Sequence, residues 1–111
     1  MQYLLAIYED EKRWANGYDP AEMAEYQKFG EEFDGAIKGG NALKPTNTAT
    51  TVRVRDGKRL TTDGPFAETK EHLSGFYLVE AKSADEAIHI AAKIPAAKFG
   101  SIEVRPIQTF S

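Results

Sequence analysis

The chain has 111 residues, of which 41% are apolar and 28% are charged, a balance typical of one globular domain. Its formal net charge is −3, and its acidic and basic residues are interleaved, so no basic face is available for DNA or RNA. The absence of cysteine excludes disulfides, thiolate metal ligands and cysteine nucleophiles. We therefore expect a single domain, residues 1–111, with no cofactor and no nucleic-acid partner.

The chain opens with residues 2–8, a short run rich in Tyr, Leu and Ile that predicts a buried strand. No basic segment or small-residue cleavage site accompanies this run. No apolar stretch approaches the roughly 20 residues of a membrane-spanning helix. The expected protein is cytoplasmic and has no membrane partner.

An amphipathic helix is predicted from Pro20 onward, because apolar residues recur there every three or four positions. Asp19 is placed to cap this helix, and Gly39-Gly40 is placed to end it in a left-handed conformation. The expected apolar stripe consists of Met23, Tyr26, Phe29 or Gly30, Phe33 and Ile37.

Residues 50–62 predict a hairpin, because two alternating segments flank Asp56-Gly57, the dipeptide favoured in type I′ turns. A strand over residues 75–81 follows, and then a second helix that Ser83 caps and Pro95 ends. The expected apolar stripe of this helix is Ala87, Ile88, Ala91 and Ile94. Residues 101–107 alternate as a last strand.

The order strand, helix, strand, hairpin, strand, helix, strand predicts an α+β fold, a ferredoxin-like split βαβ sheet with an inserted hairpin. Two helices can cover only one face of such a sheet. Apolar positions are nevertheless expected on more than one face, at Leu4, Tyr77, Val79, Ile102 and Val104. The open face is therefore expected to pair with a second copy, as a homodimer.

The stretch "TTDGPFAETKE", residues 61–71, permits two interpretations. In the first, Asp63 forms an Asx-turn and Phe66 plugs the core. In the second, Asp63 faces a pocket as a catalytic general base, with Phe66 as an apolar wall of the ligand site. The two interpretations are compatible, because loops on a rigid sheet carry both turns and sites.

Several other side chains are candidates for the same site. Glu68, Lys70 and Glu71 are typical of a solvated face, although an ammonium at Lys70 would also bind an anionic ligand beside Asp63. His72 follows the turn closely and is a second acid/base candidate, whereas His89 is expected to be exposed. With two histidines and no cysteine, a metal site is not expected.

Two tyrosines and two arginines complete the candidates. Tyr26 and Tyr77 are typical core residues that would also line any pocket between helix and sheet, where they would contact a ligand. Arg53 and Arg55 alternate with valines and share one hairpin face. They are placed either to bind a carboxylate or to protect an edge strand by their charge.

The segments "TATTVRVRDGK", "TDGPFAETKEHLSGFYLVEA" and "AAKFGSIEVRPI" resemble the DGPF-domain proteins, a branch of the YCII-related family. The resemblance covers nearly the whole chain and implies a dimeric α/β barrel, in which two ferredoxin-like sheets face each other. Simpler members of the family carry a His on the first helix, which is proposed to act with an Asp. In "DPAEMAEY" this chain has Glu22 at that position, so the histidine mechanism is not transferred and Glu22 is kept as a ligand-binding candidate.

The expected function is small-molecule binding in a pocket near the DGPF turn of a homodimer, with cofactor-free acid/base catalysis as an open extension. The alternative is a non-catalytic regulatory or interaction protein, since the resemblance implies a link to extracytoplasmic-function sigma factors. A third class, a cofactor-free monooxygenase or isomerase, rests on analogy of fold alone.

Overall fold

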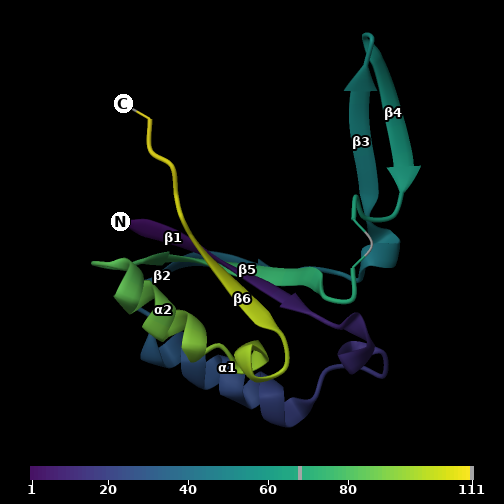
Figure 1. Ribbon diagram of the computed structural model, residues 1–111. Coiled ribbons are helices and arrows are strands. Elements are labelled where there is room, and N and C mark those ends of the chain that lie inside the picture. The colour runs from purple at the N-terminus through teal and green to yellow at the C-terminus, as the bar shows by residue number, and fades with distance from the viewer. Residues whose placement is uncertain (68, 111) are drawn as a thin grey trace.

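The computed structural model describes residues 1–67 and 69–110. A four-stranded antiparallel sheet has the order β2-β5-β1-β6, and a separate two-stranded sheet pairs β3 with β4 (Figure 1). The strands are β1 (Gln2–Glu9), β2 (Ile37–Ala42), β3 (Thr50–Arg55), β4 (Lys58–Asp63), β5 (His72–Glu80) and β6 (Ser101–Pro106). The α-helices are α1 (Pro20–Glu32) and α2 (Ala84–Ala92), and the 3₁₀ helices are η1 (Glu11–Trp14), η2 (Thr46–Thr48) and η3 (Pro95–Lys98).

Both α-helices cover the same face of the four-stranded sheet, as Figure 1 shows. The two central strands, β5 and β1, come from opposite halves of the chain, which is the arrangement of a ferredoxin-like split βαβ unit. The predicted α+β fold with an inserted hairpin is therefore confirmed. Among the described residues, no helix combines the length and the apolar character needed to cross a membrane.

The core lies between the sheet and the helices. Alternate residues of β1, Tyr3, Leu5 and Ile7, are buried there because successive side chains of a strand point to opposite faces. The predicted apolar positions on more than one face are found, because Leu4 lies on the face opposite to the other four predicted residues. The side chains of Tyr77, Val79, Ile102 and Val104 all belong to the helix-side core.

The opposite face of the sheet carries no helix (Figure 1). By strand alternation this open face presents Leu4 of β1 together with Phe76 and Leu78 of β5. All three side chains are partly exposed. An apolar centre on an uncovered sheet face is typical of a surface that packs against another layer.

The predicted start of the first helix is confirmed, because the Asp19 carboxylate accepts a hydrogen bond from the Ala21 N–H at 3.1 Å. The predicted end is wrong: α1 ends at Glu32, and Gly39-Gly40 lies inside β2. The reason is the close approach of β2 to β5. A Cβ at Gly40 would lie 2.6 Å from the Phe76 carbonyl oxygen, so only glycine fits.

The second helix also begins as predicted, with Ser83 accepting a hydrogen bond from the Glu86 N–H at 3.2 Å. Its predicted stripe needs one correction. Ile88 is 53% exposed, and Ile90 is the isoleucine that enters the core. Ile90 replaces Ile88 in the stripe because the face of the helix that meets the sheet consists of Ala87, Ile90, Ala91 and Ile94.

The hairpin of β3 and β4 turns at Asp56 and Gly57, whose φ angles of 54° and 74° confirm the predicted type I′ turn. It rises from one end of the sheet, on the side away from the helices (Figure 1). This hairpin, residues 50–63, is called the arm below. It enlarges the chain's radius of gyration to 15.9 Å, compared with about 13 Å expected for a compact chain of this length.

Candidate ligand-binding site

A cavity of about 360 Å³ lies between α1, the chain that leads into it, and the β2 side of the sheet. Its volume is within the usual range for small-molecule sites, and its walls are mainly apolar. The lining residues are Ile7, Glu9, Trp14, Tyr18, Met23, Tyr26, Gly40, Asn41, Ala42, Leu43, Ser74, Gly75, Phe76 and Tyr77.

Within residues 1–67 and 69–110, the one carboxylate that lines this cavity belongs to Glu9, the last residue of β1, which is only 3% exposed. Its Oε1 accepts hydrogen bonds from Arg13 and from the Trp14 indole N–H, the latter at 2.9 Å. Its Oε2 accepts one hydrogen bond, from the Ser74 hydroxyl at 2.6 Å. Since each carboxylate oxygen can accept about two hydrogen bonds, Oε2 retains room for one donor from a ligand.

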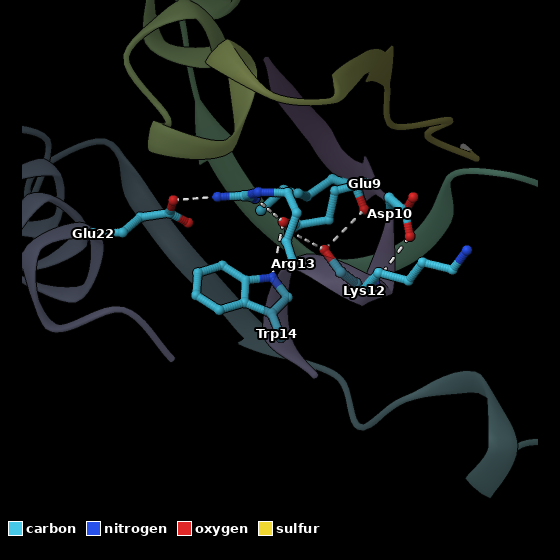
Figure 2. A network of polar contacts seen from close by, with 8 residues as sticks. Glu9, Asp10, Lys12, Arg13, Trp14 and Glu22 are labelled. Atoms are coloured by element: carbon cyan, nitrogen blue, oxygen red, sulfur yellow. Dashed lines mark hydrogen bonds and ion pairs between the residues drawn. The ribbon is translucent and has the colours of Figure 1, made fainter. Parts of the chain in front are cut away.

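Arg13 of η1 joins two buried carboxylates (Figure 2). One guanidinium nitrogen donates to Glu9 Oε1 and another to Glu22 Oε1. The guanidinium also lies 4.0 Å from the ring centroid of Phe99, a cation–π contact. In this way Arg13 fixes η1 and the first turn of α1 against the end of β1.

The charges of this cluster do not cancel. Two carboxylates, Glu9 and Glu22, share a single guanidinium, and Glu22 Oε2 is buried with no hydrogen-bond partner in the part of the chain that the structure describes. A buried site with one excess negative charge favours ligands that donate hydrogen bonds and disfavours anions. The electrostatics therefore select for uncharged hydroxyl or amino compounds over carboxylates and phosphates.

Two phenols face this cavity from opposite sides, Tyr26 on α1 and Tyr77 on β5. Burial raises the pKa of Tyr26 well above its ordinary value, and the negative charges of Glu9 and Glu22 raise it further. Burial also raises the pKa of Tyr77. Both side chains therefore remain neutral at physiological pH, when each can donate a hydrogen bond.

The outer wall is aromatic. The rings of Trp14 and Tyr18 lie 4.8 Å apart between centroids, and Tyr18 is 57% exposed. On the sheet side, Gly75 approaches β2 so closely that a Cβ would lie 2.9 Å from the Asn41 carbonyl oxygen. The aromatic rings in the lining offer faces on which a planar ligand can pack.

The structure brings some of the predicted site residues together. Tyr26 and Tyr77 line the cavity, and Glu22 is held beside it by Arg13. The other predicted ligand-binding residues, Phe66 and Lys70, are exposed and do not line it.

The DGPF turn lies at the base of the arm, outside the cavity. Phe66 is 77% exposed, so the expectation that its ring plugs the chain's core is wrong; the ring instead lies 5.2 Å from the Arg53 guanidinium. Asp63 is exposed and, among the described residues, its carboxylate accepts no hydrogen bond, so the expected Asx-turn is not formed. The turn is held by Gly64, whose N–H donates to the Ala49 carbonyl at 2.7 Å.

His72 is the first residue of β5, and the structure places it beside Glu11. Its Nδ1 lies 4.0 Å from Glu11 Oε2, which in turn accepts a hydrogen bond from the Thr46 hydroxyl. No hydrogen bond or ion pair joins His72 to Asp63 in residues 1–67 and 69–110, so their action as an acid/base pair stays a prediction. Glu68, a member of the charged run, lies outside the described residues.

Four residues that build the site were not among the sequence candidates: Glu9, Arg13, Trp14 and Ser74. One sequence pattern pointed to Glu9. It follows Tyr3, Leu5 and Ile7 with strand periodicity, so an acidic residue occupies a position on the buried face of β1. A carboxylate at such a position needs partners, and Arg13, four residues later, supplies one.

The fold and this cavity define a ferredoxin-like α+β protein with a ligand-sized site between helix and sheet. The sequence model of the family described as the YCII-related domain matches residues 1–111 of this chain. An uncharacterised protein of Rhizobium meliloti is 38% identical over 117 residues, which cover 99% of this chain and 94% of the relative. The chain belongs to the YCII-related family.

A similar solved structure is 5-chloro-2-hydroxyhydroquinone dehydrochlorinase from Burkholderia phenoliruptrix, in complex with 2,5-dihydroxybenzoquinone. The likeness has a TM-score of 0.59 and covers 97% of this chain and 94% of that one. Sequence identity is 17%, so the comparison supports the ferredoxin-like fold and not a shared reaction.

Proposed function

We propose that this protein binds a small, uncharged, hydroxylated planar compound in the cavity between α1 and the sheet. The single observation that carries the proposal is the Glu9 carboxylate, buried at the cavity wall and fixed by Arg13, Trp14 and Ser74. It offers one free acceptor position in an otherwise apolar space, and such a position orients a ligand hydroxyl.

The arrangement supports a defined role for each group. The Glu9 carboxylate accepts from a ligand hydroxyl, the neutral phenols of Tyr26 and Tyr77 donate to ligand oxygens, and the aromatic wall packs on a ring. The dehydrochlorinase of similar fold is named for a hydroxylated hydroquinone, which makes the parent hydroquinone, a planar diphenol that is uncharged near neutral pH, a suitable probe. Cofactor-free acid/base catalysis on such a ring is the enzymatic form of this proposal.

The experiment uses Trp14, the only tryptophan in the chain, as an internal reporter. Titration with hydroquinone at neutral pH is expected to change its fluorescence saturably, with isothermal calorimetry as an independent readout. Glu9→Gln should weaken binding at least tenfold, by the loss of a charge-assisted hydrogen bond worth about 1.5–3 kcal/mol. Glu25→Gln, an exposed carboxylate on α1, is the matched control and should leave affinity unchanged. Equal affinities of the wild type and Glu9→Gln would refute the assignment.

The proposal includes a homodimer formed through the open sheet face. The partly exposed Leu4, Phe76 and Leu78 supply its apolar centre, and the helices leave that face uncovered. Light scattering at micromolar concentration should give twice the chain mass of 12.3 kDa. Leu78→Asp should yield a monomer, whereas Val79, with no exposed surface and its side chain toward the helices, is not an interface residue.

The second candidate is a non-catalytic interaction protein. The observation that favours it is the arm, whose valines and leucine are exposed: Val52 by 57%, Val54 by 61% and Leu60 by 50%. Under this alternative the cavity would bind none of the probes, while the arm would still engage a macromolecule.

A further inference from the structure

The arm cannot be explained as part of its own chain's core. Each of its strands has six residues, and its apolar side chains are exposed on both faces: Val52 and Val54 on one, Leu60 on the other. An isolated two-stranded hairpin is marginally stable in water, because it has no layer to bury its side chains against. An arm of this composition therefore needs a surface supplied from outside the chain.

The reach of the arm indicates where that surface lies. Six residues at about 3.4 Å each make an arm about 20 Å long. It rises on the open side of the sheet (Figure 1), the side that the proposed dimer covers. A second sheet would pack about 10 Å away, and the helices behind it are about 10 Å thick. The tip would therefore extend past the partner's sheet to its helix layer.

The charges agree with this destination. The arm contains four of the chain's 14 basic residues and two of its 17 acidic ones, so its net charge is +2 and that of the remainder is −5. Arg55, Lys58 and Arg59 gather beside the turn at the tip. The helices carry the opposite sign: α1 exposes Glu25, Glu31 and Glu32 against Lys28, and α2 has one Asp and one Glu against no Lys or Arg.

We propose that the arm clasps a second copy of this chain, with its basic tip against the acidic outer surface of that copy's helices. The inference rests on the proposed homodimer. It adds a contact that sheet-to-sheet packing does not supply, and it gives the exposed valines, Leu60 and the basic turn one common role. Complementary charges at the tip would fix the orientation of the two copies.

A photo-crosslinking experiment tests the clasp directly, because the chain has no cysteine of its own. Lys58→Cys, at an exposed position beside the turn, is labelled with benzophenone maleimide and refolded together with ¹⁵N-labelled, unmodified chain. Illumination should give crosslinked pairs in which the ¹⁵N peptides come from residues 20–32 or 84–92. The same probe on the Leu78→Asp background should give no crosslinked pairs.

The outcomes separate the clasp from the dimer. Two results would overturn the clasp and leave the dimer standing, provided that the native mass is that of two chains. In one, crosslinks form only within the benzophenone-labelled chain; in the other, interchain crosslinks reach only residues other than 20–32 and 84–92. A native mass of one chain would overturn both. Ligand binding by Trp14 fluorescence is measured separately, so it does not depend on either result.

Discussion

The arm and the rest of the described chain, residues 1–49, 64–67 and 69–110, which is called the body below, differ in which side chains they bury and which they expose. In the body, the Arg13 guanidinium contacts two buried carboxylates, Glu9 and Glu22, and Glu9 also lines a ligand-sized cavity. In the arm, valines, a leucine and arginines are all exposed to solvent within the chain. The body therefore pairs most of its buried polar groups internally, whereas the arm leaves its apolar side chains uncovered within the chain.

The contrast shows that the segment with the most regular sequence pattern need not be the segment that carries the candidate site. The arm has the clearest local pattern in the sequence, yet its stability is expected to come from a second copy. The body around Glu9 has no motif, yet it holds a cavity-lining carboxylate that a hydrogen-bond network orients. Substitutions in the two regions should accordingly have different magnitudes and different dependence on protein concentration.

The largest effect is expected at Arg13. Arg13→Met leaves Glu9 and Glu22 buried without a cation, and removing one partner of a buried ion pair costs about 3–5 kcal/mol of unfolding free energy. The matched control is Arg105→Met, because the pair of Arg105 with Glu103 is largely exposed and should contribute little. Urea denaturation measures both.

A second substitution checks the cause of the Arg13 effect. Adding Glu22→Gln to Arg13→Met removes one of the two uncompensated charges and should recover part of the lost stability. If the double variant is no more stable than Arg13→Met, buried charge is not the reason for the loss.

The next effect compares two leucines. Leu5 has no exposed surface, so Leu5→Ala should cost about 2–5 kcal/mol through lost transfer free energy and a cavity, at any protein concentration. Leu60 is 50% exposed within the chain, so the cost of Leu60→Ala should appear only where the dimer forms. Denaturation at nanomolar and micromolar concentrations separates the two. A concentration-independent cost at Leu60 would contradict the arm's dependence on a partner.

Much of the fold followed from short-range patterns, because caps, turns and strand alternation act over a few residues. Asp19, Ser83 and Asp56-Gly57 behave as their local chemistry predicts. The end of the first helix did not follow, because Gly39-Gly40 is required by the approach of β2 to β5, a contact distant in sequence. Long-range packing overrode a local helix-stop pattern there.

The candidate site was predictable only in part. Tyr26 and Tyr77 were correctly placed in a helix–sheet pocket, since both lie on apolar faces of predicted elements. The partners of Glu9 were missed because η1 and the bulge beside Ser74 are irregular, and irregular backbone leaves little periodicity to read. The DGPF turn, by contrast, has a plain Asp-Gly-Pro turn pattern, yet it lies outside the cavity.

A smaller effect is expected from Tyr26 at high pH. Because the pKa of Tyr26 is raised in the folded state, the folded chain holds the phenol proton more tightly than the unfolded chain. Its contribution to stability is fully present below the ordinary tyrosine pKa of about 10 and is lost above it, by about 1.4 kcal/mol per pH unit. Tyr26→Phe should flatten this decline in denaturation midpoints between pH 9 and 11. An unchanged slope would show that this phenol is not held neutral by burial.

The central claim is that the ligand site belongs to the body, at Glu9, and not to the DGPF turn. Calorimetric titration of hydroquinone into Glu9→Gln and Asp63→Asn at neutral pH tests it most directly, with circular dichroism to show that both variants are folded. The account predicts at least tenfold weaker binding for Glu9→Gln and wild-type affinity for Asp63→Asn. Lost binding in Asp63→Asn, with wild-type affinity in Glu9→Gln, would contradict it and return the site to the turn.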